Sequence, residues 1–132
     1  ARAIRRRGEA AIADFAIAAT GPDMRCARLS GGNAQKVILA REFAKARRLL
    51  LCNQPTRGVD VGATEFIHGE FLKLRSHGGA VLLISEDLEE IFQLSDRIAV
   101  MFRGRIVADL PVEQASVERV GLLMAGIEEK AA

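Results

Sequence analysis

The stretch Leu29–Lys36, with the sequence LSGGNAQK, carries residue types that can bind a phosphate. Its two glycines let a backbone approach a ligand closely, and they open a predicted helix whose first N–H groups have no partner inside the helix. Ser30 adds a hydroxyl group, and the helix dipole adds partial positive charge at the same end. The pattern therefore indicates an anion site. The alternative is a serine N-cap followed by a flexible glycine pair, with no ligand.

A second polar group follows an apolar stretch. Residues 49–60 read LLLCNQPTRGVD, so a predicted buried strand ends at Asn53 and Gln54. Proteins that bind nucleotides hold Mg²⁺ with acidic side chains at the carboxyl end of such a strand. Here two amides stand where the acids are expected. The alternative is a polar turn that caps a strand of the core.

Alternating helices and apolar strands must position these groups. This alternation indicates an α/β layered fold with a mainly parallel sheet and flanking helices. The strand at 48–53 is apolar throughout, which is typical of a strand covered on both faces. The predicted helices are 3–16, 31–46, 63–76, 86–95 and 115–126. The predicted strands are 48–53, 78–85 and two within 97–110 that meet at Arg103 and Gly104. Loops are predicted over 18–28 and from the end of the strand 48–53 to Gly62.

The composition fits one domain or part of one. The chain has 132 residues, 49% of them hydrophobic, with no Trp and no Tyr, so the core is expected to consist of Leu, Ile, Val and Ala. No apolar run approaches the roughly 20 residues that span a bilayer. Cys26 and Cys52 lack metal-ligand spacing. Residues 1–48 hold 11 Lys or Arg against 4 Asp or Glu, so this half either faces phosphates or anionic lipid headgroups or is a solvated surface.

Taken together, the two motifs resemble those of the ABC transporter ATPase family. LSGG precedes QPTRGVD, and LLIS and SDRIAV follow, so the resemblance covers residues 8–126. LSGGNAQKV, PTRGVDVGA and LSDRIAVMFRG are similar to the second cassette of the twin-cassette ATPases that drive bacterial sugar and nucleoside import. NQPTRG, EFIH and LLMAG resemble the nucleoside branch of these ATPases more than the sugar branch.

This resemblance implies a P-loop NTPase fold and a role for each motif. Residues 1–46 are expected to form part of the helical subdomain with the ABC signature, and residues 47–132 the C-terminal part of the ATPase core. Asn53 stands at the Walker B aspartate and Gln54 at the catalytic glutamate. The implied catalytic positions are Gln54 and Glu86, the latter at the switch histidine, and Asn53 is the implied magnesium ligand. The implied nucleotide-binding residues are Leu29, Ser30, Gly31, Gly32, Gln35, Asn53 and Asp60, the last of these in the D-loop.

The sequence departs from the family at the cassette's own nucleotide site. It contains no Gly-x-x-x-x-Gly-Lys-Ser/Thr phosphate loop and no Q-loop, so it is expected to be the C-terminal part of a cassette, either a fragment or a truncated product. Asn53 offers Mg²⁺ only a neutral carbonyl, and Gln54 cannot accept a proton from water. Glu86 at neutral pH would repel a phosphate. This site is therefore expected to hydrolyse ATP poorly, and the chain alone to be inactive.

The signature and Asp60 keep the family pattern. In this family two cassettes pack head to tail, and each signature closes over the nucleotide that its partner holds. The implied partners are a second ATP-binding cassette, transmembrane permease subunits and, indirectly, a solute-binding protein, with ATP and Mg²⁺ as cofactors of the complete transporter and no nucleic acid. The implied location is the cytoplasmic face of the inner membrane. The alternatives are a non-transport ABC ATPase that acts on nucleic acid and a structural fragment with no nucleotide role.

Overall fold

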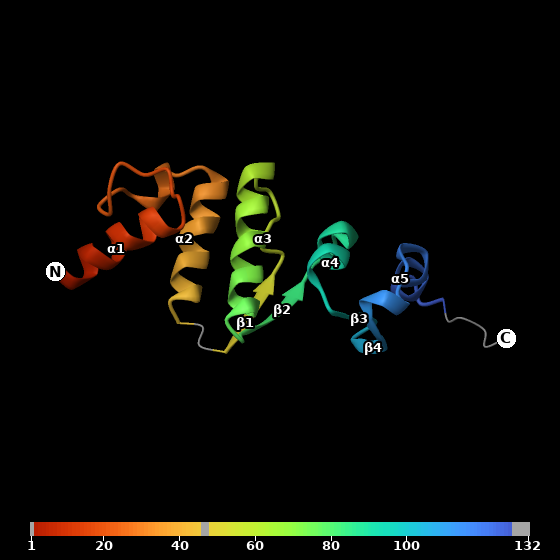
Figure 1. The fold of residues 1–132 in the computed structure, drawn as a ribbon. Helices are drawn as coiled ribbons and strands as arrows, with labels where there is room; N and C mark the ends of the chain where they lie inside the picture. The colour runs from red at the N-terminus through yellow and green to blue at the C-terminus, as the bar shows by residue number, and fades with distance from the viewer. Residues whose placement is uncertain (1, 46–47, 128–132) are drawn as a thin grey trace. The chain divides into compact units, whose positions relative to one another are not determined.

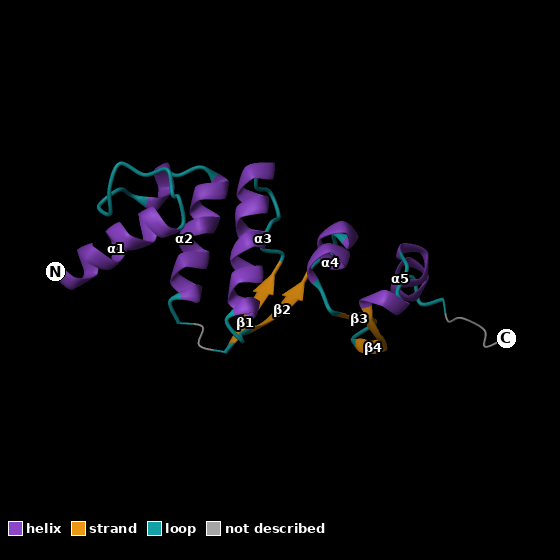
Figure 2. Cartoon of the chain, in the orientation of Figure 1, coloured by secondary structure: helices purple, strands orange, loops and turns teal. Residues whose placement is uncertain are grey.

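The chain forms two compact units in the computed structural model, which describes residues 2–45 and 48–127 (Figures 1 and 2). The first unit spans Ala1–Ile84 and the second spans Ser85–Ala132. The sequence predicts a subdomain boundary between residues 46 and 47, and this boundary stays a prediction. Residue 46, the predicted end of the helix 31–46, lies outside the described residues.

The first unit places helices beside a pair of parallel strands. The strands β1 and β2 pair in register from Leu49 opposite Ala80 to Asn53 opposite Ile84. Parallel strands need a crossover connection, and here the helix α3 supplies it. The elements are α1 (Arg2–Asp14), the short 3-10 helix η1 (Cys26–Arg28), α2 (Gly31–Phe43), β1 (Leu49–Asn53), α3 (Val61–Ser76) and β2 (Ala80–Ile84).

The core of this unit contains buried residues of α2, of α3 and of one face of β1. Leu50 and Cys52 are buried because alternate side chains of a strand point to the same face. Ala63, Ile67 and Phe71 recur every four residues along α3 and are buried as well, which is the spacing of one helix face. Phenylalanine adds to the expected aliphatic core. Ring contacts link Phe15, Phe43, Phe66 and Phe71, with centroids 5.8 to 6.2 Å apart.

The opposite face of β1 and β2 is open, which corrects the expectation that this strand is covered on both faces. Leu49 and Leu51 are 60% and 62% exposed, and Leu82 and Ile84 on β2 are 50% and 47% exposed. The registration of the two strands brings these side chains to one face. The described helices of this unit cover only the face that holds Leu50, so an apolar surface remains in contact with solvent.

The second unit is an antiparallel hairpin packed against a short helix. The strands β3 and β4 meet at Arg103 and Gly104, as predicted, and both turn residues have positive φ angles of 46° and 78°. Two consecutive positive φ values are typical of the tight turns that join antiparallel strands. Ile98 and Val100 pack with Val120 and Leu123 to form the core. The elements are α4 (Leu88–Leu94), β3 (Arg97–Phe102), β4 (Arg105–Pro111), the 3-10 helix η2 (Val112–Gln114) and α5 (Val117–Met124).

Capping residues explain why several helices begin at other positions than predicted. The helix predicted over 63–76 begins at Val61 because the Asp60 carboxylate accepts a hydrogen bond from the N–H of Ala63. The helix predicted over 86–95 spans only Leu88–Leu94, with Asp87 as its N-cap.

Among the described residues, the strands comprise one parallel and one antiparallel pair. In the same part of the chain, no helix has both the length and the apolar character needed to cross a membrane.

Candidate functional site

The N-termini of α2 and α3 lie against each other and form the centre of the candidate site. Gly32, in the first turn of α2, is buried. A Cβ atom on Gly32 would lie 3.1 Å from Oδ2 of Asp60 and 3.2 Å from Cβ of Ala63, so only glycine fits here without a shift. Gly31 is exposed, and its Cβ position is 3.6 Å from the carbonyl oxygen of Gly58. The structure therefore brings the predicted residues Gly31, Gly32 and Asp60 together.

Ser30 caps α2, as the sequence predicts for a serine before two glycines. Its Oγ accepts a hydrogen bond from the backbone N–H of Asn33 at 3.4 Å and a second one from Nδ2 of Asn33 at 2.8 Å. The carbonyl oxygen of Ser30 accepts the N–H of Ala34 at 2.8 Å, which begins the helix. Since both hydrogen bonds to Oγ are accepted ones, the hydroxyl proton of Ser30 is left to donate to another group.

Asn33 contacts both Ser30 and the preceding loop, an arrangement that the sequence did not predict. Its Oδ1 accepts the backbone N–H of Ala18 at 2.7 Å, which fixes the orientation of the amide and directs Nδ2 to Ser30. Lys36 ties the same loop to α2, since its Nζ donates to the carbonyl oxygen of Ala16 at 3.3 Å and lies 4.8 Å from the ring centre of Phe66. The sequence near Asn33 does not indicate these contacts, because they are made with the loop at residues 16–18, which is distant in the sequence.

The remaining signature residues frame this helix start. Leu29 is half-buried and follows η1, and its N–H donates to the carbonyl oxygen of Cys26 at 3.0 Å. Gln35 is half-buried in the second turn of α2. The first turn of α2 contains no acidic residue. The N–H groups of this helix start and the Ser30 hydroxyl suit an anion such as a phosphate, while the carboxylate of Asp60 lies on the Gly32 side of the same turn.

Asn53 and Gln54 lie at the carboxyl end of β1, as predicted. Asn53 is exposed and pairs with Ile84, and the N–H of Gln54 donates to the carbonyl oxygen of Ile84 at 2.8 Å. Gln54 has a φ of +50°, a conformation that few residues other than glycine adopt. Such strained backbone is concentrated at functional sites. The tight turn after β1 therefore holds two amides, rather than two acids, at the tip of the strand.

The donor set at this tip fits magnesium poorly. Asn53 contributes one neutral amide oxygen, whereas Mg²⁺ is usually held through carboxylates and phosphates. Across residues 2–45 and 48–127, no three His, Cys, Asp or Glu side chains gather in a geometry that could hold a metal ion. A magnesium ion near Asn53 would therefore depend on the oxygens of a bound nucleotide.

Glu86 is exposed and belongs to the second unit. It lies one residue before Asp87, whose N–H donates to Oγ of Ser85 at 3.1 Å and whose carboxylate caps α4. The turn between β2 and α4 therefore presents the Glu86 side chain to solvent.

The chain has curated relatives among import ATP-binding proteins, although no family model matches it. It is 53% identical over 104 residues to the guanosine import ATP-binding protein NupO of Bacillus subtilis, covering 79% of this chain. It is 55% identical over 98 residues to the glucose import ATP-binding protein TsgD13 of Haloferax volcanii, covering 74% of this chain. The chain spans only 20% and 18% of the lengths of these two relatives.

Solved structures confirm the α/β fold of an ATP-binding cassette. The chain aligns with the ATP-binding cassette MJ0796, solved as a dimer in a post-hydrolysis state with ADP and Pi, at a TM-score of 0.72 and 23% identity. This alignment covers 81% of the present chain and 46% of that cassette. The similarity in structure gives the fold, and the identity to the import proteins gives the family. The chain is thus part of an ATP-binding cassette and belongs to the ABC transporter ATPase family.

Proposed function

We propose that the chain is part of the ATP-binding subunit of an ABC importer for a simple sugar or a nucleoside. The observation that carries this proposal is the start of α2, where Ser30 caps the helix and Gly32 packs against Asp60, in a chain more than half identical over the matched residues to import ATP-binding proteins. One of these relatives is named for guanosine and the other for glucose, which supports both solute classes.

In the proposed mechanism this chain completes a nucleotide site on a partner cassette. Residues Leu29–Gln35 act as the signature and close over the ATP that the partner holds. The exposed Gly31 N–H and the free proton of the Ser30 hydroxyl donate to the γ-phosphate. Gly31 must lack a side chain so that the backbone can approach the phosphate, and Gly32 must lack one because Asp60 occupies that space.

The chain's own site is proposed to be catalytically poor. Bound Mg²⁺ would neutralise phosphate charge, and Asn53 would hold it only through a neutral oxygen. Gln54 can orient a water molecule but cannot take its proton, because an amide is not a base at neutral pH. Glu86 at the switch position would carry a negative charge and could not donate a hydrogen bond to phosphate. Hydrolysis therefore depends on the partner's acid and base.

The proposed partners follow from a signature that acts on another cassette's nucleotide. A second ATP-binding cassette supplies the nucleotide over which the signature closes, transmembrane permease subunits carry the solute, and a solute-binding protein delivers it to them. The proposed location is the cytoplasmic, inner face of the membrane, without a nucleic-acid partner. The names of the relatives, which describe import, support these assignments.

A comparison of two variants in the assembled transporter tests the proposal. Gly31→Asp places a negative charge where the partner's γ-phosphate is expected, so the ATPase rate should fall by about a hundredfold, the cost of losing one preorganised donor. Gln54→Ala should change the rate little, because no base is removed. If Gln54→Ala abolished hydrolysis while Gly31→Asp retained it, the proposed division between a poor site and a donated signature would be wrong.

A further inference from the structure

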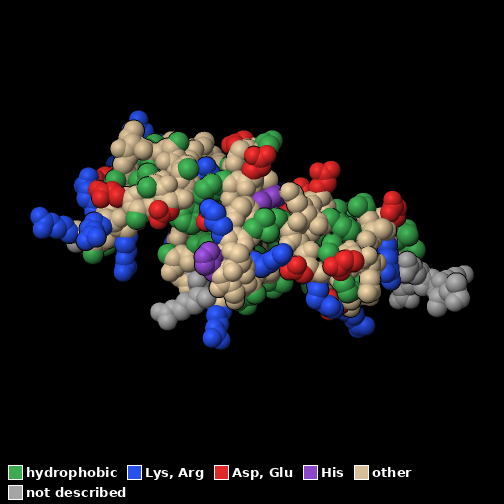
Figure 3. All heavy atoms as spheres, in the orientation of Figure 1, with side chains coloured by type: hydrophobic (Ala, Val, Ile, Leu, Met, Phe, Trp, Pro, Cys, Tyr) green, Lys and Arg blue, Asp and Glu red, His purple; other side chains and the backbone are tan. Residues whose placement is uncertain are grey.

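We propose that α1 and the loop after it, residues 15–28 with η1 at its end, bind anionic lipid headgroups at the membrane surface. Six arginines lie on these two segments, and all of them are exposed. Blue side chains gather over α1 and this loop in Figure 3. We refer to these residues, Arg2, Arg5, Arg6, Arg7, Arg25 and Arg28, as the basic surface.

Most of the positive charge on the basic surface is not neutralised within the chain. Residues 2–28 contain only three acids, and two of them pair with the same arginine: Arg5 contacts Glu9 at 3.3 Å and Asp23 at 2.8 Å. In the part of the chain that the structure describes, no ion pair joins an acid to Arg2 or to the other four arginines. Their guanidinium groups remain available for an external anion.

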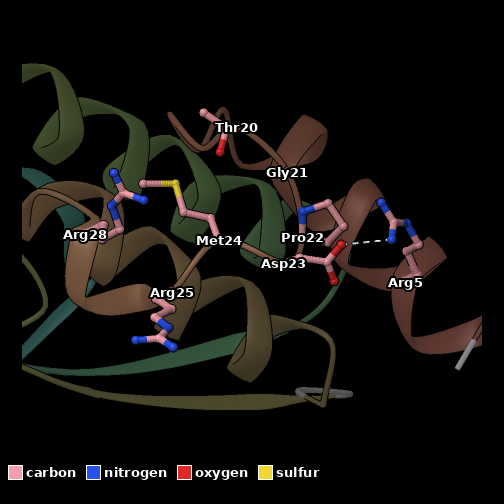
Figure 4. Close-up of a pocket in the computed structure, with 8 residues that line it drawn as sticks. All are labelled: Arg5, Thr20, Gly21, Pro22, Asp23, Met24, Arg25 and Arg28. Carbon is pink, nitrogen blue, oxygen red and sulfur yellow. Dashed lines mark ion pairs between the residues drawn. The ribbon is translucent and has the colours of Figure 1, made fainter.

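Packing of the loop on α1 concentrates this charge. A Cβ atom on Gly8 would lie 2.9 Å from Cβ of Pro22, so the loop lies directly on the helix at this point. Arg5, Arg25 and Arg28 line a hollow of about 430 Å³ together with Thr20, Met24 and Asp23, the acid that pairs with Arg5 (Figure 4). Guanidinium groups bind phosphate oxygens through two parallel hydrogen bonds, and the hollow has room for a headgroup phosphate.

The side chains around these arginines favour a lipid over a nucleic acid. Ile4 is 77% exposed on α1, and such an apolar side chain can enter the boundary between headgroups and acyl chains. Phe15, the one aromatic residue of the segment 2–28, packs edge-on against Phe43 and Phe66 and is not available to stack on bases. The choice of a membrane also rests on the proposed function, because an importer subunit works at a bilayer.

Vesicle co-sedimentation of the full 132-residue chain tests the inference without nucleotide or ATPase activity, so its result is independent of the proposed function. The chain should bind vesicles of about 70% phosphatidylcholine and 30% phosphatidylglycerol more tightly than pure phosphatidylcholine vesicles, and added salt should weaken this binding. Arg2→Gln combined with Arg6→Gln should reduce binding roughly 25-fold, since each arginine near an anionic surface contributes about fivefold.

Two further variants make the test specific. Asp23→Asn removes the acid that pairs with Arg5 and should raise binding to the anionic vesicles about fivefold. Arg103→Gln combined with Arg105→Gln makes the same change in net charge on the hairpin turn of the second unit, outside the basic surface, and should leave binding unchanged. Equal binding to neutral and anionic vesicles, an equal loss in both double variants, or displacement of the vesicles by low concentrations of single-stranded RNA would overturn the inference.

Discussion

At the scale of single residues, the amide of Asn33 controls what the Ser30 hydroxyl can do. Because Oδ1 of Asn33 is occupied by the N–H of Ala18, its Nδ2 must face Ser30 and donate to it. The hydroxyl proton then points away from Asn33. A proton held free in this way needs no reorganisation before it meets a phosphate, which is the condition for strong electrostatic stabilisation of a transition state.

Replacing this amide by a carboxylate should therefore impair the signature while keeping its shape. In Asn33→Asp one oxygen still accepts the Ala18 N–H, but the other can only accept, so it draws the Ser30 proton toward itself. In the assembled transporter the ATPase rate should fall by about a hundredfold, as for Ser30→Ala. The double variant should be no slower than Ser30→Ala alone, because both changes remove the same donor. Wild-type activity in Asn33→Asp, beside an inactive Ser30→Ala, would contradict this role.

At the scale of elements, the contact between the two helix starts decides which glycines can be replaced. Glycine in a helix costs about 1 kcal/mol relative to alanine, so replacement by alanine usually stabilises. Gly32→Ala should instead lower the free energy of unfolding by about 1 kcal/mol, because the new Cβ meets Asp60 and Ala63. Gly69→Ala in α3 is the matched control, since its Cβ position has no atom within 4 Å.

Thermal denaturation of the two variants measures this difference. Gly69→Ala should be more stable than the parent chain by up to about 1 kcal/mol, and Gly32→Ala less stable. A stabilised Gly32→Ala would show that α2 can move away from Asp60 at little cost.

The sequence predicts elements better than it predicts the contacts between them. The parallel strands and the hairpin turn at Arg103 and Gly104 follow from local apolar runs and turn residues, so they could be read directly. The Ser30 cap could be predicted too, because it depends on its immediate neighbours. The hydrogen bonds of Asn33 and the packing contact of Gly32 could not, since they depend on Ala18 and Asp60, which only tertiary packing brings close.

At the scale of the whole molecule, the open apolar face of β1 and β2 sets how the chain behaves in solution. Leu51→Ser combined with Leu82→Ser should reduce the binding of a hydrophobic dye and self-association, with little loss of stability, because both side chains are about half exposed or more. Leu50→Ser on the buried face should cost at least about 2 kcal/mol. Dye fluorescence and sedimentation velocity check these outcomes. Unchanged dye binding in the double serine variant would mean that the hydrophobic dye does not bind at this face.

The chain as a whole should bind nucleotide weakly. Its 132 residues contain no Gly-x-x-x-x-Gly-Lys motif, so no backbone loop and lysine surround the phosphates. Calorimetry with Mg-ATP should give a dissociation constant no tighter than about 1 mM, which corresponds to roughly −4 kcal/mol. Asn53→Asp with Gln54→Glu should leave the chain without hydrolysis, and phosphate release by this variant above a buffer control would count against the explanation.

The contact between Gly32 and Asp60 also has a mechanical consequence. Oδ1 of Asp60 holds the first turn of α3 through Ala63, while Oδ2 faces the first turn of α2. One carboxylate thus contacts the first turns of both helices, so a shift of either helix start toward Asp60 would bring it into collision with this side chain. A displacement of Asp60 would therefore be transmitted to the first turn of α2 through its carboxylate and through the neighbouring side chain of Ala63.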